Sequence, residues 1–274
     1  MAKTDFSAFL VAHPHSILVE ITEARGSTPR DAGTLMLVSR EAIWGTIGGG
    51  HFEFMAIENA RQLLDGQGVA VMDIPLGPEI GQCCGGRTTL RFSTVTASLA
   101  AALGDKLLRE TEVEPSVFVF GAGHVGLALA HALSPLPLSV TIVETRAEAL
   151  ADLPPEVTRR HVAMPETVIS DIPNGGAAVI LTHDHALDFL IGREALARTD
   201  LAYVGMIGSK TKRATFASYL EREQGNRADL ERLILPIGGS TVRDKRPTVI
   251  AAMVAAELLG VLLGQTTSLL CVRS

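Results

Sequence analysis

The first 97 residues combine apolar runs of strand length with one helical pattern. The strand-type runs are Ser16–Ala24, Thr34–Ser39, Ala42–Ile47, Val69–Leu76 and Thr88–Val95. Between the third and fourth runs, apolar residues recur at helical spacing over His51–Leu64. This spacing predicts a helix with one apolar face, formed by Phe54, Ile57, Ala60 and Leu64. We therefore expect an N-terminal mixed α/β domain over residues 1–97.

Residues 98–115 are rich first in alanine and leucine and then in charges, which predicts a helix followed by a linker. Beyond them lie short, largely apolar strands: Val117–Phe120, Ser139–Val143, Ala177–Thr182 and Leu201–Met206. Strands that are buried on both faces and alternate with helices are typical of parallel βαβ units. The expected fold class is therefore α/β, with a Rossmann-like doubly wound parallel sheet over residues 116–274.

A last helix is predicted from Arg246-Pro247, because proline is favoured in the first turn of a helix. This helix is apolar nearly all round, so it is expected in the core or at a subunit interface, and a homodimer is the expected assembly. Its most apolar stretch, Val249–Leu263, contains Glu257 and is too short to cross a bilayer of about 30 Å. We therefore expect no membrane partner.

Composition narrows the classes of function. Hydrophobic residues make up 47% of the 274 residues, which allows a packed core and excludes wholesale disorder. The net charge of −6 and the 4% aromatic content argue against a nucleic-acid partner. The three cysteines, Cys83, Cys84 and Cys271, form no disulfide framework. The N-terminus has no apolar stretch typical of a signal peptide, so a cytoplasmic location is expected.

A glycine motif of the form GxGxxG joins the strand Val117–Phe120 to the following helix. Its glycines are Gly121, Gly123 and Gly126, and Glu144 ends the next strand. Such glycines let a pyrophosphate approach the backbone, and the acid can bind a ribose diol. The alternative is a Rossmann fold whose nucleotide site is empty or repurposed. Arg146 leaves the choice between NAD and NADP open.

Three further turns carry candidate binding residues. In Gly208-Ser209-Lys210, backbone amides and the cations Lys210, Lys212 and Arg213 are expected to meet an anion, unless Ser209 only caps a helix. Gly48-Gly49-Gly50, with Arg30 nearby, is expected to expose free N–H groups to a ligand or to form a tight turn. His183 and His185 are expected on one side of a strand extension, as a metal or proton-transfer pair or as a loop wall.

The most distinctive segment is Gly81-Gln82-Cys83-Cys84-Gly85-Gly86. Adjacent cysteines with Gly81 before them and Gly85-Gly86 after them are expected to be exposed, and their thiolates suit a soft metal, sulfur transfer or redox chemistry. Arg87 could lower a thiol pKa. The alternative is two small buried residues.

Seven segments in this order resemble the XdhC/CoxI family, the accessory proteins of xanthine dehydrogenase. They are Ala24–Arg30 (ARGSTPR), Gly45–Gly50 (GTIGGG), Gly81–Gly86 (GQCCGG), Val119–Gly126 (VFGAGHVG), Leu181–Asp188 (LTHDHALD), Val204–Lys210 (VGMIGSK) and Leu235–Gly239 (LPIGG). The resemblance extends from about Ser16 to Leu259. Ser240–Pro247 departs from the family pattern, which more often carries a glycine and Lys-Thr-Pro there.

The resemblance implies a chaperone for the molybdenum cofactor rather than an enzyme, with no catalytic residue of its own. Such proteins bind and shield molybdopterin, support its sulfuration by a cysteine desulfurase, and insert it into the molybdenum-binding subunit of xanthine dehydrogenase. Molybdenum is then expected at Cys83 and Cys84, beside Gln82, and the cofactor phosphate at Gly48–Gly50 or Gly208–Lys210. The alternatives are an NAD(P)-dependent oxidoreductase that uses the Rossmann domain, and a cysteine-dependent redox or sulfurtransferase protein.

Overall fold

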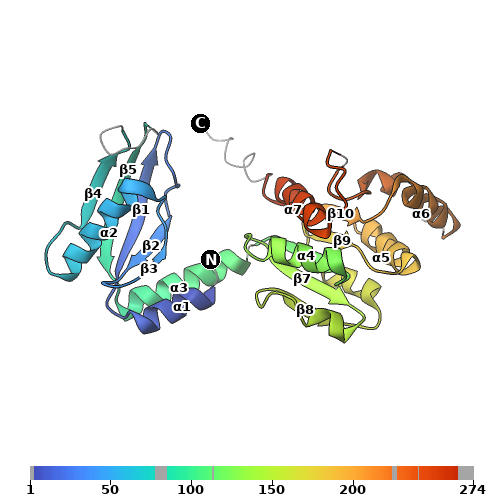
Figure 1. Ribbon diagram of the computed structural model, residues 1–274, viewed down its shortest axis with the longest axis horizontal. Helices are drawn as coiled ribbons and strands as arrows, with labels where there is room; N and C mark the ends of the chain where they lie inside the picture. Colours follow the sequence, from blue (N-terminus) through green and yellow to red (C-terminus); the bar gives the residue numbers. More distant parts are fainter. Residues whose placement is uncertain (1–2, 78–84, 113, 224–226, 240, 265–274) are drawn as a thin grey trace. The chain divides into compact units, whose positions relative to one another are not determined.

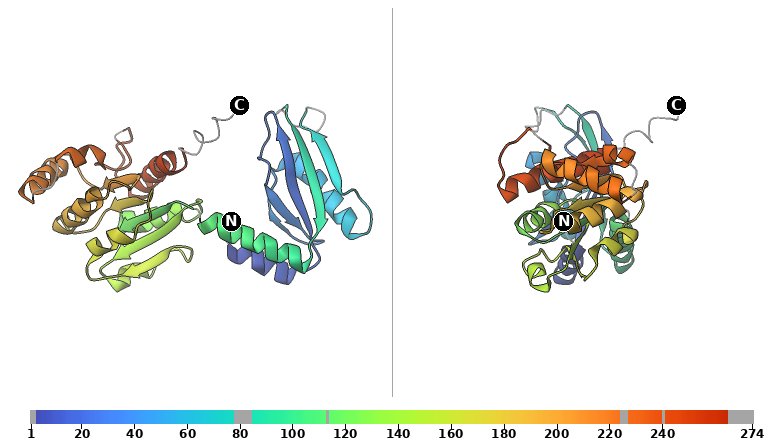
Figure 2. Two further views of the ribbon diagram at one scale, coloured as in Figure 1. Left: turned by 180° about the vertical axis from the view of Figure 1, so that it is seen from behind. Right: turned by 90° about the vertical axis from the view of Figure 1, so that its right-hand side faces the viewer.

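The computed structural model describes residues 3–77, 85–112, 114–223, 227–239 and 241–264. The chain divides into two compact units, residues 1–110 and 111–274, and each is described by itself (Figures 1 and 2). Gln82, Cys83, Cys84 and Cys271 lie outside the described residues.

The first unit is built on a five-stranded antiparallel sheet in the order β3-β2-β1-β5-β4. Its strands are β1 (Ile17–Arg25), β2 (Leu35–Val38), β3 (Ile43–Gly45), β4 (Val71–Pro75) and β5 (Arg87–Thr94). Its helices are α1 (Lys3–Ala12), α2 (Gly50–Leu64) and α3 (Ala97–Glu112). On the central strand, Val19 lies opposite Met36 of β2 and Phe92 of β5. The five strands expected from the apolar runs are all present.

Alternate residues of β1 point to opposite faces of this sheet, and different helices cover the two faces. Ile17, Val19 and Ile21 pack on the side covered by α2, whereas Leu18 packs on the side of α1 and α3. Figure 1 shows α2 across one face and α1 beside α3. The helix expected within residues 98–115 is therefore part of the packing of the first unit.

The expected buried face of α2 is wrong in part. Phe54 is 60% exposed, whereas Phe52, Ala56 and Ala60 are buried. Phe52 and Phe54 are both apolar and lie two residues apart, so they cannot share one face of a helix. Phe52 sets the rotation of the helix, and Phe54 stacks on His51 outside.

The second unit contains a six-stranded sheet in the order β11-β10-β9-β6-β7-β8. Its strands are β6 (Ser116–Phe120), β7 (Ser139–Glu144), β8 (Thr158–His161), β9 (Ala177–Ile180), β10 (Tyr203–Met206) and β11 (Leu233–Ile234). All paired strands run parallel. Counted from β6, the order is 6-5-4-1-2-3, which is the doubly wound Rossmann order with its switch point between β6 and β9. The expected fold class is confirmed.

Helices cover both faces of the parallel sheet. The helical elements are α4 (His124–Leu133), η2 (Ala147–Leu150), η3 (Pro165–Asp171), α5 (His185–Ala197), α6 (Lys210–Arg222), η4 (Arg227–Arg232) and α7 (Pro247–Leu262). Helices α4 and α7 pack in the core on one face, and η3, α5 and α6 pack on the other. β6, β9 and β10 are buried almost throughout because both of their faces are covered.

The apolar helix α7 packs against α4 within its own unit. Ala251, Val254, Ala255 and Leu258 are buried in that core. Its one acid, Glu257, accepts hydrogen bonds from the Tyr203 hydroxyl at 2.8 Å and from Gly238 N–H at 2.9 Å. Burial and the nearby Glu257 carboxylate raise the pKa of Tyr203. Packing in the core of the second unit thus accounts for one apolar face of α7. The homodimer stays a prediction.

In the described part of the chain, no helix is both long and apolar enough to cross a membrane.

Two glycines of the GxGxxG turn provide a test of packing. A Cβ on Gly126 would lie 2.0 Å from the Gly121 carbonyl oxygen, whereas a Cβ on Gly123 would meet nothing within 4 Å. We expect Gly126→Ala to lower the free energy of unfolding by about 2 kcal/mol or more, and Gly123→Ala, at the N-cap of α4, to lower it by about 1 kcal/mol or less. Denaturant unfolding of the two variants measures this difference, and equal stabilities would contradict the described turn.

Candidate functional site

The GxGxxG turn lies at the switch point of the parallel sheet, and its three glycines have different structural roles. Gly121 has φ +115°, and a Cβ there would lie 2.6 Å from the Leu181 carbonyl oxygen. Gly126 allows α4 to pack against the Gly121 carbonyl. Gly123 has an ordinary φ of −71° and open space beside it. The chain itself does not need a glycine at this position, which leaves room for a ligand close to the backbone.

Glu144, at the end of β7, reaches across to this turn. Its side chain is only 3% exposed. Oε2 accepts a hydrogen bond from Ala122 N–H at 2.9 Å and pairs with Arg146 Nη2 at 3.1 Å. Oε1 accepts from the backbone N–H groups of Thr145, at 2.9 Å, and Arg146, at 3.1 Å. The carboxylate therefore has backbone partners on both oxygens.

These contacts fix the charge of Glu144. Burial alone would raise the pKa of its carboxyl group. The hydrogen bonds from the Arg146 side chain and from the backbone N–H groups of Ala122, Arg146 and Thr145 outweigh burial and lower that pKa to about 2. Glu144 is therefore an anion at neutral pH, as a ribose-binding acid must be.

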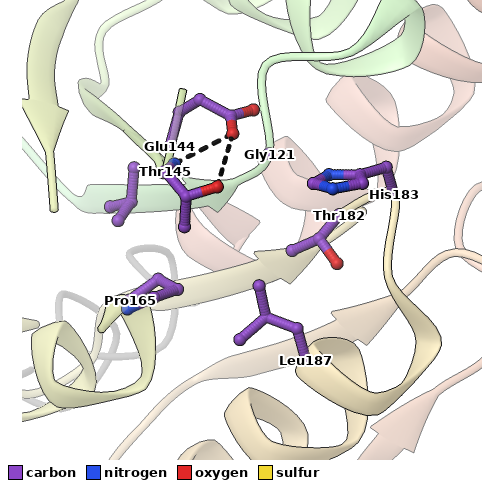
Figure 3. Close-up of a pocket in the computed structure, with 8 residues that line it drawn as sticks. Gly121, Glu144, Thr145, Pro165, Thr182, His183 and Leu187 are labelled. Carbon is purple, nitrogen blue, oxygen red and sulfur yellow. Dashed lines mark hydrogen bonds between the residues drawn. The ribbon is translucent and has the colours of Figure 1, made fainter. Parts of the chain in front are cut away.

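A cavity opens between Glu144 and the loop after β9. Figure 3 shows Glu144 and Thr145 on one side of it, His183 and Thr182 on another, and Pro165 and Leu187 below. These residues come from the ends of β7 and β9 and from η3 and α5. The cavity has a volume of only about 10 Å³, which is room for about one water molecule. A nucleobase is therefore too large for this cavity in this conformation.

The expected arrangement of His183 and His185 is wrong. β9 ends at Ile180, and His185 is the first residue of α5, so the two histidines do not lie on a strand extension. Asp184 between them caps α5 by accepting a hydrogen bond from Ala186 N–H at 2.8 Å. His183 lines the small cavity. Among the described residues, no group of three or more His, Cys, Asp or Glu could hold a metal ion.

A buried ion pair that the sequence did not predict joins the first turns of helices α5 and α6. Lys212 Nζ pairs with Asp188 Oδ2, and their side chains are 8% and 0% exposed. Asp188 Oδ1 also accepts hydrogen bonds from the Thr182 N–H at 2.9 Å and hydroxyl at 2.7 Å. Lys212 donates a second bond to the Ile207 carbonyl at 2.9 Å. The only sequence indication was an acid and a lysine at otherwise apolar helix positions.

This pair changes the expected anion site at Gly208-Ser209-Lys210. Lys212 is committed to Asp188, and Arg213 donates to the carbonyl oxygens of Leu230 at 2.6 Å and Leu233 at 2.7 Å. The expectation of three converging cations is therefore wrong. Ser209 caps α6, with Lys212 N–H 3.4 Å from its hydroxyl oxygen. Lys210 is exposed and has no ion pair with any described residue.

In the first unit, the turn Gly48-Gly49-Gly50 is explained by its backbone. All three glycines have positive φ, +130°, +77° and +67°. Glu53 accepts hydrogen bonds from the N–H groups of Ile47 at 2.9 Å and Gly49 at 3.2 Å, and Gly48 N–H donates to the Thr46 hydroxyl at 3.1 Å. The expectation of free N–H groups is therefore wrong for Gly48 and Gly49.

Two of the family-like segments of the first unit, Ala24–Arg30 and Gly45–Gly50, meet at one end of its sheet, where Gly85 and Gly86 also lie. β1, β3 and β4 end there, and β2 and β5 begin there. A Cβ on Gly48 would lie 2.7 Å from the Pro29 ring, next to the exposed Arg30. A Cβ on Gly86 would lie 2.2 Å from the Ser27 carbonyl oxygen. The segment Ala24–Arg30 therefore adjoins both Gly48 and Gly86, the second of the glycines that follow the cysteine pair.

The base of the β4–β5 hairpin is well defined. Gly85 N–H donates to the Leu76 carbonyl at 2.9 Å, and Leu76 N–H donates to the Gly86 carbonyl at 2.8 Å. Arg87, expected to act on a thiol, pairs with Asp73 instead, with its Nη2 2.8 Å from Asp73 Oδ2. The hydrogen bond between them lowers the pKa of Asp73 and raises that of Arg87.

Glu144 makes the stability of the second unit depend on pH. Its folded pKa of about 2 lies below the ordinary value of 4.5. Its ionisation therefore stabilises the fold above pH 4.5, and this stabilisation is lost as pH falls towards 2. We expect Glu144→Gln to cost up to about 3 kcal/mol at pH 7 and almost nothing near pH 2. Denaturant unfolding across this range tests this, with the exposed Glu156→Gln as control; a difference that does not depend on pH would contradict it.

Comparison with known proteins identifies both units. Residues 12–74 match the XdhC and CoxI family, and residues 117–258 match the XdhC Rossmann domain. The chain is 25% identical over 252 residues to the uncharacterized protein YqeB of Escherichia coli K12. That match covers 89% of this chain but 43% of YqeB, so the chain spans less than half the length of this relative.

A solved structure shares the fold over nearly the whole chain. It is described as a xanthine dehydrogenase from Bacillus halodurans, with 17% sequence identity and a TM-score of 0.79. The match covers 97% of each chain. At this identity the likeness shows the fold alone, but the family match extends over more than half of the chain. The chain therefore belongs to the XdhC and CoxI family.

Proposed function

We propose that this chain is an accessory protein that binds the molybdenum cofactor and delivers it to a xanthine dehydrogenase. The observation that carries the proposal is the family membership, which extends over both units. Membership supports a role in xanthine dehydrogenase maturation. The bound cofactor is then shielded, sulfurated by a cysteine desulfurase and inserted into the molybdenum-binding subunit of the apoenzyme. In this role the chain acts as a carrier in the cytoplasm, as a homodimer, and needs no catalytic residue of its own.

The chemistry of the first unit supports a place for the cofactor. When bound, the cofactor supplies a soft molybdenum–dithiolene centre and a phosphate. Cys83 and Cys84 have the ligand type that such a metal prefers, and they directly precede Gly85 in the chain. Gly86 adjoins the loop that carries the exposed Arg30. The sequence thus puts two soft ligands immediately before glycines that adjoin the loop of a cation.

The two turns expected for the cofactor phosphate are not equally suitable. At Gly48–Gly50, the Glu53 carboxylate already accepts the N–H groups of Ile47 and Gly49, and its negative charge would repel a phosphate. At Gly208–Lys210 no carboxylate is bound to the turn within the described residues, and Lys210 is exposed. Each turn taken by itself, the first is therefore already occupied by the Glu53 carboxylate, whereas the second has no such competitor among the described residues.

Cysteine variants test the carrier function directly. We expect wild-type protein, purified anaerobically from a host that makes the cofactor, to contain molybdenum and a pterin in equal amounts. Cys83→Ala or Cys84→Ala should lower the bound cofactor at least tenfold, since each removes a soft ligand. Cys271→Ala is the matched control, because it also removes one thiol but lies far from the pair in the sequence. Molybdenum and pterin are measured by mass spectrometry and by fluorescence after oxidation.

The carrier proposal fails if wild-type protein never binds the cofactor under these conditions. It also fails if the three cysteine variants retain equal amounts of cofactor. A maturation assay with apo xanthine dehydrogenase then distinguishes binding from delivery.

A second candidate function is an NAD(P)-dependent oxidoreductase. The doubly wound strand order, the open space at Gly123 and the anionic Glu144 favour it. The small volume of the cavity beside Glu144 argues against this function.

Gly123→Val decides whether the Rossmann turn binds a nucleotide. Its φ of −71° tolerates valine, so the fold should remain intact, but the side chain would occupy the space that a pyrophosphate needs. We expect calorimetry with NAD and NADP to show binding to the wild-type protein only, if this second function is correct. Equal binding by both proteins, or none by either, would exclude this turn as a nucleotide site.

A further inference from the structure

A second and much larger cavity lies at the carboxyl edge of the parallel sheet. It has a volume of about 530 Å³ and lies between the loops that follow β10 and β11 and the start of α7. This volume is typical of small-molecule sites, which range over roughly 300–1,000 Å³. Its walls are largely apolar and are formed by Ile207, Ile237, Val242, Ile250 and Met253. An apolar body of about one or two rings fits such walls.

The rim of this cavity is positively charged. Arg243 and Lys245 line it, are exposed, and form no ion pair or hydrogen bond with any described residue. The acid between them is already neutralised, because Asp244 Oδ2 accepts from Arg246 Nη2 at 2.6 Å and from Nε at 2.8 Å. Two cations therefore remain available in a chain whose net charge is −6. Such a rim favours an anionic ligand.

The walls of the cavity are held in place by buried polar contacts. Glu257 accepts the N–H of Gly238, which fixes the turn after β11. Lys212 donates to the Ile207 carbonyl, which fixes the opposite wall. Gly239 has φ +69°, and a Cβ there would meet nothing within 4 Å. The walls at Gly238 and Ile207 are thus preformed, and Gly239 leaves backbone open to a ligand.

We propose that this cavity binds a small organic anion, with its ring body against the apolar walls and its phosphate or carboxylate group at Arg243 and Lys245. The cavity shares Gly208 with the Gly208–Lys210 turn, but it uses none of the cysteines on which the proposed carrier function depends. It also differs from the small cavity beside Glu144, with which it shares no lining residue.

The binding test uses 8-anilinonaphthalene-1-sulfonate, which combines aromatic rings with one negative charge and fluoresces when it enters an apolar site. We expect the double variant Arg243→Gln/Lys245→Gln to bind this probe at least tenfold more weakly than wild type. The control Arg91→Gln/Arg109→Gln removes the same charge from exposed positions of the first unit and should bind like wild type. Equal affinities of the two double variants would overturn the proposal.

Displacement of the probe separates the contribution of the ring from that of the anion. Phenyl phosphate and benzoate should displace it at least tenfold more effectively than phenol, which lacks the charge, and inorganic phosphate, which lacks the ring. The better of the two anionic competitors identifies the preferred acid group. Displacement by phenol or by inorganic phosphate alone at similar concentrations would overturn the proposal.

A third variant tests whether the probe binds inside this cavity by filling it with a larger side chain. Met253→Trp fills the cavity without changing charge and should weaken probe binding at least tenfold, with thermal unfolding as the check that the fold is intact. Unchanged or tighter binding would overturn the proposal. Cys83→Ala/Cys84→Ala should bind the probe like wild type, so failure of the carrier function and failure of this site are distinguishable.

Discussion

The buried ion pair between Asp188 and Lys212 is the contact on which the candidate sites of the second unit depend. Two charges removed from water are stabilised only if every remaining hydrogen-bonding group has a partner. Here Thr182 and the Ile207 carbonyl provide those partners. Thr182 lines the small cavity beside Glu144, and Ile207 lines the larger one. Loss of either charge would leave the other buried and unpaired, at a cost of about 3–5 kcal/mol. The same contact therefore fixes one wall of each cavity.

The GxGxxG turn shows how one motif can serve both the fold and a ligand. Gly121 and Gly126 are required by close backbone contacts, so they would be needed in a Rossmann unit that binds nothing. Gly123 has no such requirement within the described chain. Glu144 completes the turn by accepting a hydrogen bond from Ala122 N–H. A ribose hydroxyl group would have to compete with this N–H for the same carboxylate. Binding at this turn therefore requires a rearrangement of the contacts around Glu144.

The sequence predicted the two architectures well, because strand period, glycine turns and alternation of strands with helices are local properties. The family resemblance was likewise confirmed by the comparisons. The predictions that failed concerned the directions of side chains. Phe52 is buried and Phe54 is exposed, because the rotation of a helix about its axis depends on its packing against the sheet and not on the helix sequence alone. Lys212 turned inward to Asp188, 24 residues away, and no local pattern reports such a partner. The contacts of Glu53 had a local indication in the sequence, because an acid in the first turn of a helix is well placed to accept the N–H groups of the preceding glycine turn.

The contacts of Glu53 have a consequence for any anion that docks at the Gly48–Gly50 turn. The carboxylate is tethered to the same helix, so its effective concentration at the turn far exceeds that of a free ligand. An incoming anion would replace an internal competitor rather than water, which lowers its net affinity. When it leaves, Glu53 restores the hydrogen bonds of Ile47 and Gly49 at once, so departure exposes no unbonded amides. Such a turn therefore favours its own carboxylate over the permanent retention of a free anion.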